Sequence, residues 1–393
     1  MSVEEALTYL SLVTCIRIAP FAVYAAVSGV GLPRLGLLGI GLVFSIGYVA
    51  RAGHGARLVW LFVGAVCYLA VSLAAHALAR SLSNTSIVTP FRRFTVFVAL
   101  YSLCLGIPGL LGPREATVFL PFGWELTLRS FSYVVETTRT NSTPRIRESL
   151  FFLLVDPTLF YPLRAVRDGG HHWTACLARM SAGLLLMLMN VLLLRPLTNS
   201  VDTALPSALD TLFLTPVKGW AHVFSLYVVH SGLAHFQIGA LAFCGWSAQE
   251  RYNWPLLATS PGEFWKRWNT YVRVWLEAYI FLPLATRAVR HAGCADSHAR
   301  YGLQFAAVVV AFLVSGVLHD LYGLSVGNLA LRWTPLFVFG AGVGALWQLG
   351  TRALRSSADT DVGAGRQMRS RALRGLAMMG VVAAGGVVLR GPG

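Results

Sequence analysis

The sequence predicts an all-α integral membrane protein, a polytopic bundle of transmembrane helices that encloses a polar tunnel. Hydrophobic residues make up 55% of the 393 positions and charged residues only 12%, whereas soluble proteins contain about 25% charged residues. The mean hydropathy is +0.61. Charged residues are missing from long stretches of the chain, which is the pattern that a hydrocarbon solvent requires.

The individual helices follow from the lengths of these uncharged stretches. A helix needs about 20 apolar residues to cross the hydrocarbon core, and about eleven segments meet that measure, some of them open to a re-entrant or interfacial placement. Backbone polar groups in lipid must be satisfied internally, and the alternating ten-residue pattern of a barrel is not seen. The segments are 6–30, 35–50, 57–79, 94–112, 117–135, 175–195, 219–245, 268–286, 301–324, 333–351 and 372–389.

The segments form one integral membrane domain, 1–393, because no repeat and no separate soluble domain interrupts them. We divide it into N-terminal helices in 1–115, a central core in 116–326 and C-terminal helices in 327–393. The arginine-rich polar loop 352–371 is expected to face the cytoplasm, since basic loops are retained on that side. The expected location is the cytoplasmic membrane of a bacterium, with multiple passes.

Charge and cysteine content exclude several classes of function. The net charge is +15, but the basic residues lie between apolar segments and not in patches interleaved with aromatic residues. We therefore expect contacts with anionic membrane lipids and no nucleic-acid partner. The six cysteines are scattered along the chain. Because disulfide frameworks and metal sites need clustered spacing, we predict neither, and no metal ligands are assigned.

The first candidate motif is SPGEFWKRWN, residues 260–269. Ser260 at the N-cap and Glu263 at the third helical position form a capping box that predicts a helix start. Trp265, Trp268 and Asn269 recur at helical spacing on one face. The segment is therefore predicted to be an amphipathic helix at the membrane surface, with its aromatic face turned inward. Asn269 has a structural alternative, a hydrogen bond between helices.

The second candidate motif is VSGVLHDLYG, residues 314–323, at the end of a long apolar run. Ionisable groups are costly inside a membrane, so His319 is expected to line a polar cavity. Ser315 and Gly316 lie one turn earlier on the same face and leave room beside the imidazole. The alternative is an interfacial histidine bonded to a backbone carbonyl. Asp320 either supports His319 or sits at the water boundary.

Together these motifs resemble those of the membrane-bound O-acyltransferases (MBOATs). The run FWKRWN, 264–269, resembles the family's FWxRW-type segment followed by Asn or His, and SGVLH, 315–319, resembles its later histidine span. The similarity covers about 120–325, which makes 116–326 an MBOAT-like catalytic core. Weaker similarities occur in the same order at TLRSFSYVVE (127–136), LFYPLRAVRD (159–168), HSGLAHFQIG (230–239) and YNWP (252–255).

The resemblance mixes features of two branches of the family. The 230–239 span is similar to one in bacterial polysaccharide O-acetylases, whereas Asn269, and His319 followed by an acid, look more like the sterol, diacylglycerol and wax-ester branches. The resemblance implies transfer of an acyl group from a thioester, acyl-CoA or an acyl carrier, to a hydroxyl of a lipid, a small molecule or a glycan. No cofactor is implied beyond the thioester co-substrate.

Acyl transfer needs a base for the hydroxyl proton and a donor for the developing oxyanion. His319 suits the first role, and Asn269 can polarise the acyl carbonyl or orient the hydroxyl without adding charge. We also expect substrate contacts from the remaining candidate residues, of which the two arginines would meet the phosphates of a CoA donor. These residues are Trp265, Trp268, Ser315, His235, Arg287 and Arg290.

Two other classes of function remain open from the sequence. A membrane transporter would explain buried His and Asn equally well, but it usually shows broken helices in two repeated halves, which are not seen. A lipid-binding relative without catalysis would be expected to have lost His319 or Asn269, and both are present. The acyltransferase hypothesis is therefore the one that the ordered motifs favour.

Overall fold

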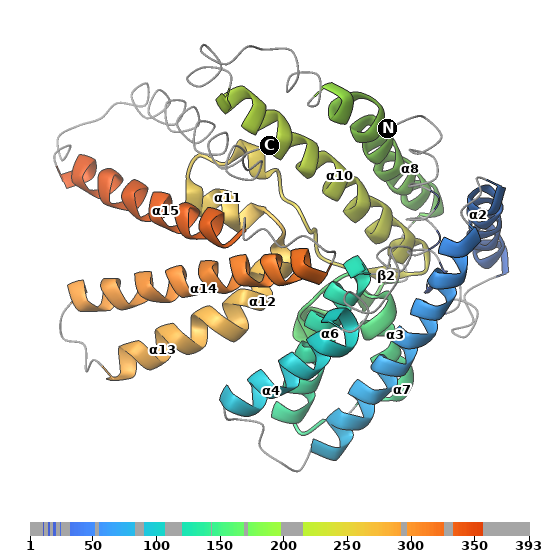
Figure 1. Ribbon diagram of the computed structural model, residues 1–393, viewed down its shortest axis with the longest axis horizontal. Coiled ribbons are helices and arrows are strands. Elements are labelled where there is room, and N and C mark those ends of the chain that lie inside the picture. The colour runs from blue at the N-terminus through green and yellow to red at the C-terminus, as the bar shows by residue number, and fades with distance from the viewer. Residues whose placement is uncertain are drawn as a thin grey trace. The chain divides into compact units, whose positions relative to one another are not determined.

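The computed structural model is helical almost throughout (Figure 1). It describes residues 32–51, 55–82, 90–106, 120–168 except 143, 172–197, 215–291, 297–325 and 333–356, with isolated positions before residue 32. The expected spans 6–30, for the most part, and 372–389 lie outside the described residues. The expected basic loop 352–371 begins inside a helix, which ends at Ser356, and the rest of that loop also lies outside them.

Twelve α-helices account for most of the described chain, and π-helical turns extend several of them. They are α2 (Leu32–Arg51), α3 (Gly55–Leu82), α4 (Pro90–Tyr101), α6 (Leu120–Arg139), α7 (Ile146–Leu150), α8 (Trp173–Met189), α10 (Thr215–Phe243), α11 (Pro261–Arg267), α12 (Thr270–Leu276), α13 (Leu282–His291), α14 (Ser297–Ser325) and α15 (Trp333–Ser356). The π-helical turns are Ser102–Gly106, Phe151–Val155, Asn190–Leu194 and Glu277–Phe281. Two short strands, β1 (Val166–Arg167) and β2 (Trp246–Ser247), pair antiparallel and were not predicted.

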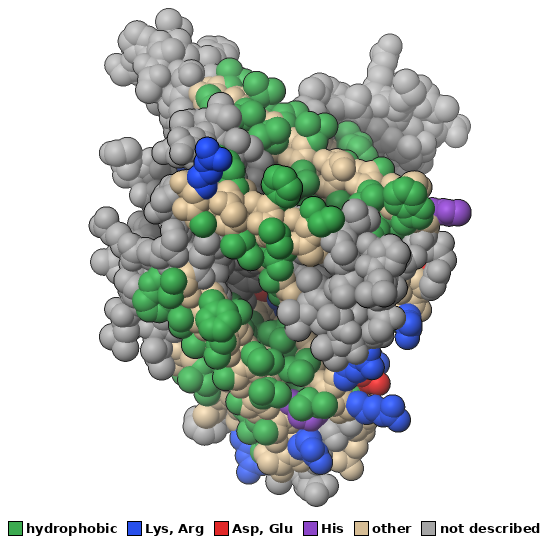
Figure 2. Space-filling model, turned by 90° about the vertical axis from the view of Figure 1, so that its right-hand side faces the viewer, with side chains coloured by type: hydrophobic (Ala, Val, Ile, Leu, Met, Phe, Trp, Pro, Cys, Tyr) green, Lys and Arg blue, Asp and Glu red, His purple; other side chains and the backbone are tan. Residues whose placement is uncertain are grey.

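Four of the described helices are long and apolar enough to cross a membrane: Phe62–Leu82, Trp173–Leu197, Val223–Phe243 and Gly302–Leu324. Each lies within or overlaps an expected span. Large apolar side chains are exposed on the described surface, among them Phe44 at 77% and Phe62 at 72%, as lipid contact requires. Figure 2 shows such hydrophobic side chains at many places on the surface in view. The chain is thus consistent with an all-α membrane protein, and the larger number of spans and the polar tunnel stay predictions.

The described chain divides into two compact units. The first comprises Met1–Leu193, Val228–Glu250 and Leu324–Asn328, and the second comprises Leu194–Tyr227, Arg251–Gly323 and Leu329–Gly393. Helix α10 contributes its first part to the second unit and its remainder to the first. The two sequence motifs at 260–269 and 314–323 both belong to the second unit.

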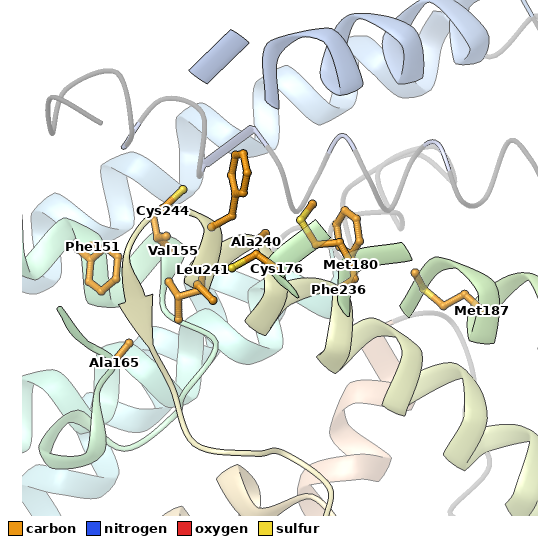
Figure 3. Close-up of a cluster of buried hydrophobic side chains, with 12 residues drawn as sticks. Phe151, Val155, Ala165, Cys176, Met180, Met187, Phe236, Ala240, Leu241 and Cys244 are labelled. Atoms are coloured by element: carbon orange, nitrogen blue, oxygen red, sulfur yellow. The ribbon is translucent and has the colours of Figure 1, made fainter. Parts of the chain in front are cut away.

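Helices α8 and α10 make a close contact in the first unit. Phe236 on α10 and Met180 on α8 belong to one buried apolar cluster (Figure 3). Two glycines allow the backbones to approach: a Cβ on Gly183 would lie 2.5 Å from the carbonyl oxygen of Gly232. Small residues at such crossings allow close packing of the two backbones. This packing favours helix association in lipid, where there is no hydrophobic driving force between helices.

Helix α6, expected as the span 117–135, is instead a polar helix enclosed by protein. Glu125 and Arg129 are 5% and 4% exposed and form an ion pair 3.3 Å apart. The hydroxyl of Tyr133 lies 2.9 Å from Nδ1 of His76 on α3 and 2.7 Å from the hydroxyl of Ser149. Such side chains are costly in lipid and are stable here because protein groups satisfy them.

A buried carboxylate organises the loop after α7. The Asp156 side chain is fully buried and accepts hydrogen bonds from the backbone N–H groups of Thr158 (2.8 Å) and Ala165 (2.7 Å). Its own carbonyl accepts a bond from Arg129. Burial raises the pKa of the Asp156 carboxyl above its usual range, although these donors act in the opposite direction. The segment 156–165 is thereby fixed to α6.

Candidate active site

Helix α11 begins as its sequence predicts. The Ser260 hydroxyl accepts a hydrogen bond from the backbone N–H of Glu263 (3.2 Å), and the Glu263 carboxylate accepts one from the N–H of Thr259 (2.8 Å). The bond from Thr259, aided by the ion pair with Arg267, holds the pKa of the Glu263 carboxyl below its usual range. This contribution to stability is present above the ordinary carboxyl pKa and is lost as the pH falls through the lowered value.

The expected continuous helix through Trp268 and Asn269 is wrong. Helix α11 ends at Arg267, Trp268 is extended, and Asn269 adopts a left-handed conformation with φ of 35° before α12 starts at Thr270. Asn269 therefore lies at a turn between two short helices and shares no helical face with Trp265. A non-glycine residue in this conformation is strained, although Asn tolerates it better than most, and such positions concentrate at functional sites.

The turn is held by the segment 251–253, a contact that was not predicted from the sequence. Backbone bonds run from Thr270 N–H to the Arg251 carbonyl (2.8 Å) and from Asn253 N–H to the Arg267 carbonyl (3.0 Å). The buried guanidinium of Arg251 also donates its Nε–H to Oδ1 of Asn269, at 3.2 Å. Because a guanidinium only donates, this bond assigns the carboxamide oxygen to Arg251 and leaves the NH2 group as the donor on the opposite side.

His319 lies on α14, inside the candidate span Gly302–Leu324, and its side chain is partly buried. Its Nδ1 lies 2.7 Å from the backbone carbonyl oxygen of Ser315. A carbonyl can only accept, so Nδ1 carries the proton and the lone pair of the neutral imidazole lies on Nε2. The carbonyl bond that the structural alternative expects is thus present, and it leaves Nε2 as the basic nitrogen of the ring.

The Asp320 carboxylate is buried and contacts the start of the following helix. It is 6% exposed and accepts bonds from the backbone N–H groups of Trp333 and Thr334, both at 2.9 Å. These are the first two residues of α15, so Asp320 caps that helix. Trp333 and Phe337 of α15 in turn lie against the imidazole, with ring centroids 5.1 and 5.0 Å from it.

An unbroken row of aromatic rings joins the surroundings of Asn269 to His319. Trp268, the neighbour of Asn269, stacks on Phe264 with centroids 5.3 Å apart. Phe264 contacts Trp265 at 5.3 Å, and Trp265 contacts Phe337 at 5.5 Å. Since Phe337 lies against His319, the row of rings runs from the sequence neighbour of Asn269 to His319 within the second unit.

The other predicted site residues are placed as follows. Ser315 is 3% exposed, and its backbone carbonyl makes the contact with His319. Arg287 and Arg290 are exposed on α13 of the second unit. His235 lies on the part of α10 that belongs to the first unit, where its side chain is half-buried. Substrate contacts of these residues stay predictions.

Replacing Trp268 with Ala should lower the free energy of unfolding by about 3 kcal/mol, the lower end of the cost of a buried aromatic side chain, because this ring is half-buried. The loss removes ring contacts to Phe264, Tyr227 and Tyr252. Thermal unfolding of the purified protein measures it. Trp254→Ala is the matched control, since Trp254 is 67% exposed; equal Tm values for the two variants would show that Trp268 does not support the fold.

Sequence reasoning missed Arg251, Trp333 and Phe337, and it left the role of Asp320 open. Each acts through a partner that is distant in sequence: Arg251 meets Asn269 18 residues later, and Asp320 meets Trp333 13 residues later. Proximity to the motifs could have indicated two of these residues. Arg251 directly precedes the YNWP motif, and Asp320 directly follows His319.

No protein-family model matches this sequence. The chain is similar to proteins named "Probable alginate O-acetylase AlgI". It is 24% identical over 181 residues to the one from Azotobacter vinelandii, covering 42% of this chain and 36% of the relative. It is 22% identical over 178 residues to the one from Pseudomonas aeruginosa, covering 42% and 34%. The aligned part thus spans about a third of the relatives' length.

These relatives are named as O-acetylases, so the weak similarity agrees with the predicted resemblance to the O-acyltransferases. It supports the polysaccharide O-acetylase branch and not the mixture with sterol and wax-ester enzymes that Asn269, and His319 followed by an acid, led us to expect. Those two features therefore do not identify a branch. The side chain at the turn and the residue after the histidine have structural causes here, namely the left-handed backbone of Asn269 and the capping of α15 by Asp320.

Proposed function

We propose that this chain transfers an acetyl group from an acetyl thioester to a hydroxyl of a polysaccharide, with His319 as the general base and Asn269 as the donor to the oxyanion. The observation that carries the proposal is the bond from His319 Nδ1 to the Ser315 carbonyl, which sets the basic tautomer inside an aromatic environment. The names of the similar proteins support acetyl as the group and a polysaccharide as the acceptor.

The reaction follows from these groups. Nε2 of His319 takes the hydroxyl proton as the oxygen attacks the thioester carbon, and the charge that develops on the carbonyl oxygen is met by the Asn269 NH2 group. Collapse of the tetrahedral intermediate breaks the C–S bond, and the imidazolium returns its proton to the leaving thiolate. The ester and the free thiol are the products. The aromatic rings exclude water, which would otherwise compete with the acceptor for the thioester.

The test uses detergent-solubilised full-length protein, radiolabelled acetyl-CoA and alginate as the probe acceptor. We expect label to enter the polymer as an alkali-labile ester and free CoA thiol to appear with it. Label that enters added lipid in place of the polymer would contradict the acceptor class, and an absence of any CoA thiol above the level of a His319→Ala protein would contradict the reaction.

We further propose that Arg287 contacts the phosphates of the CoA donor, because it is an exposed cation on the basic helix α13. Arg287→Ala should then raise the KM for acetyl-CoA by about tenfold with little change in kcat, as expected for loss of binding that is equal in the ground and transition states. Steady-state kinetics measure this. Arg287→Lys keeps the charge and should keep a KM near that of the natural protein, whereas an unchanged KM in the Ala variant would contradict the assignment.

A further inference from the structure

The link between α14 and α15 is more specific than ordinary helix packing. Both oxygens of the Asp320 carboxylate are used, one by the N–H of Trp333 and the other by the N–H of Thr334, each at 2.9 Å. Bonds from backbone N–H groups to an ionised carboxylate at a helix start are among the stronger ones in proteins, because the helix dipole adds to them. At 6% exposure this carboxylate is largely withdrawn from water.

A glycine one turn earlier brings the two helices into backbone contact. A Cβ on Gly316 would lie 2.5 Å from Cα of Thr334 and 3.1 Å from the carbonyl oxygen of Trp333. Gly316 and Asp320 are four residues apart and therefore lie on one face of α14. The start of α15 is thus fixed at two successive turns, by close approach at the first and by two hydrogen bonds at the second.

The fixed helix forms one wall of the His319 environment. Trp333, in the first turn of α15, and Phe337, one turn later, both contact the imidazole ring. Phe337 also contacts Trp265, whose indole lies 3.6 Å from where a Cβ on Gly340 would be. If the start of α15 moved, both rings that confine the imidazole would move with it.

The geometry also argues against a direct role for Asp320 in the proton transfer. A carboxylate that orients a catalytic histidine accepts the Nδ1–H bond. Here the Ser315 carbonyl accepts that bond, while both oxygens of Asp320 accept from α15. The charge of Asp320 also acts on the imidazole directly, but contacts that orient the ring come from Trp333 and Phe337.

We propose that Asp320 is a positioning residue for His319: it holds the start of α15 so that Trp333 and Phe337 keep the imidazole in the orientation in which Nδ1 bonds to the Ser315 carbonyl. This inference rests on the proposed function, since it gives a task to the residue beside the proposed base. Asn at 320 has one acceptor in place of two, and its NH2 group would oppose one of the α15 N–H donors. Asp320→Asn should therefore loosen the link with little change in volume.

The test is a double-mutant cycle of Asp320→Asn and His319→Ala in the acetyl-CoA and alginate assay, with rates expressed per folded molecule. In the natural background Asp320→Asn should lower kcat by about 10–100-fold, as displacement of a catalytic group by about 1 Å does, and leave the KM for acetyl-CoA within about twofold. In the His319→Ala background the same substitution should change the residual rate by less than about twofold. Hydrogen exchange of the amides at the start of α15 should accelerate in both backgrounds.

Several results would overturn the inference. Equal losses of kcat in both backgrounds would mean that Asp320 acts independently of His319, and faster amide exchange with unchanged kcat would mean that the link is structural alone. In either case the rate loss in His319→Ala itself would leave the proposed function standing. Near-normal turnover of His319→Ala would overturn both. Glu277→Gln is the matched control, because that carboxylate is 44% exposed, pairs with Arg273 and should leave kcat unchanged.

Trp333→Leu is run in the same cycle, because Asp320→Asn also removes a charge near His319 and Trp333→Leu does not; it replaces Asp320→Asn should that variant fail to fold. Trp333→Leu keeps the backbone N–H to Asp320 and removes the ring that lies against His319. The same dependence on His319 is expected, and equal losses in the two backgrounds would again overturn the inference.

Discussion

Replacing His319 with Ala is expected to lower acetyl transfer by about 10²–10⁴-fold per folded molecule, the contribution of a general base. The rate of the natural protein should rise with pH through a single ionisation as the imidazole loses its proton, and that rise should vanish in the variant. Rates across a pH series, measured on detergent-solubilised protein of known folded fraction, give both quantities.

His172→Ala is the matched control for this prediction. His172 precedes α8, is exposed and makes no side-chain cap bond, so its loss should change neither the rate nor the pH profile. If His319 were only a packing residue, its substitution would lower the yield of folded protein and leave the rate of the remaining molecules intact. A well-folded His319→Ala protein with near-normal turnover would contradict the mechanism.

Loss of the Asn269 side chain should lower kcat by about 10²–10³-fold, the cost of removing one oxyanion donor. The left-handed backbone at this position decides which substitution tests the donor cleanly. Ala would add backbone strain of about 1–2 kcal/mol, so a weakly folded Asn269→Ala protein would be ambiguous. Gly adopts the same φ without strain and removes the carboxamide, so Asn269→Gly should fold and lose activity.

Asn269→Asp supplies the complementary control. Its oxygen can still accept the bond from Arg251, but it has no N–H to donate, so kcat should fall as in the Gly variant. Full activity of Asn269→Gly would show that Asn269 is needed only for the turn. If Asn269 and His319 serve one transition state, the doubly substituted protein should lose less than the product of the two single losses.

The features that the sequence predicted correctly are those with local causes. Ser260 and Glu263 form their bonds within four residues of one another, and the expected helix start is confirmed. The apolar runs near 57–79 and 301–324 became α3 and α14, because uncharged length alone favours a helix in lipid. The position of His319 near the end of a membrane-length helix could be predicted because the apolar run itself defines that helix.

The features that escaped prediction depend on partners remote in sequence. Helical spacing favoured one helix through Asn269, but backbone bonds to Arg251 and Asn253 supply a competing arrangement that local periodicity cannot reveal. From the sequence, Asp320 could equally be an acidic residue at the membrane interface, because its bond to the first turn of α15 joins residues 13 positions apart. The ring contacts of His319 could not be predicted from the sequence either, because Trp333 and Phe337 come from a later helix.

The buried charged side chains of α6 also affect how the chain can insert into a membrane during synthesis. A translocon releases a segment into lipid according to its summed transfer free energy, and an ionised side chain at the centre of a helix costs about 2.5–3.5 kcal/mol. Glu125, Arg129 and Glu136 make α6 a poor candidate for release on its own. Helices α3 and α4, which pack against α6, are synthesised before it and can cover these side chains. We therefore expect insertion of this part of the protein to be cooperative, with the earlier helices contacting the later one as it enters the membrane.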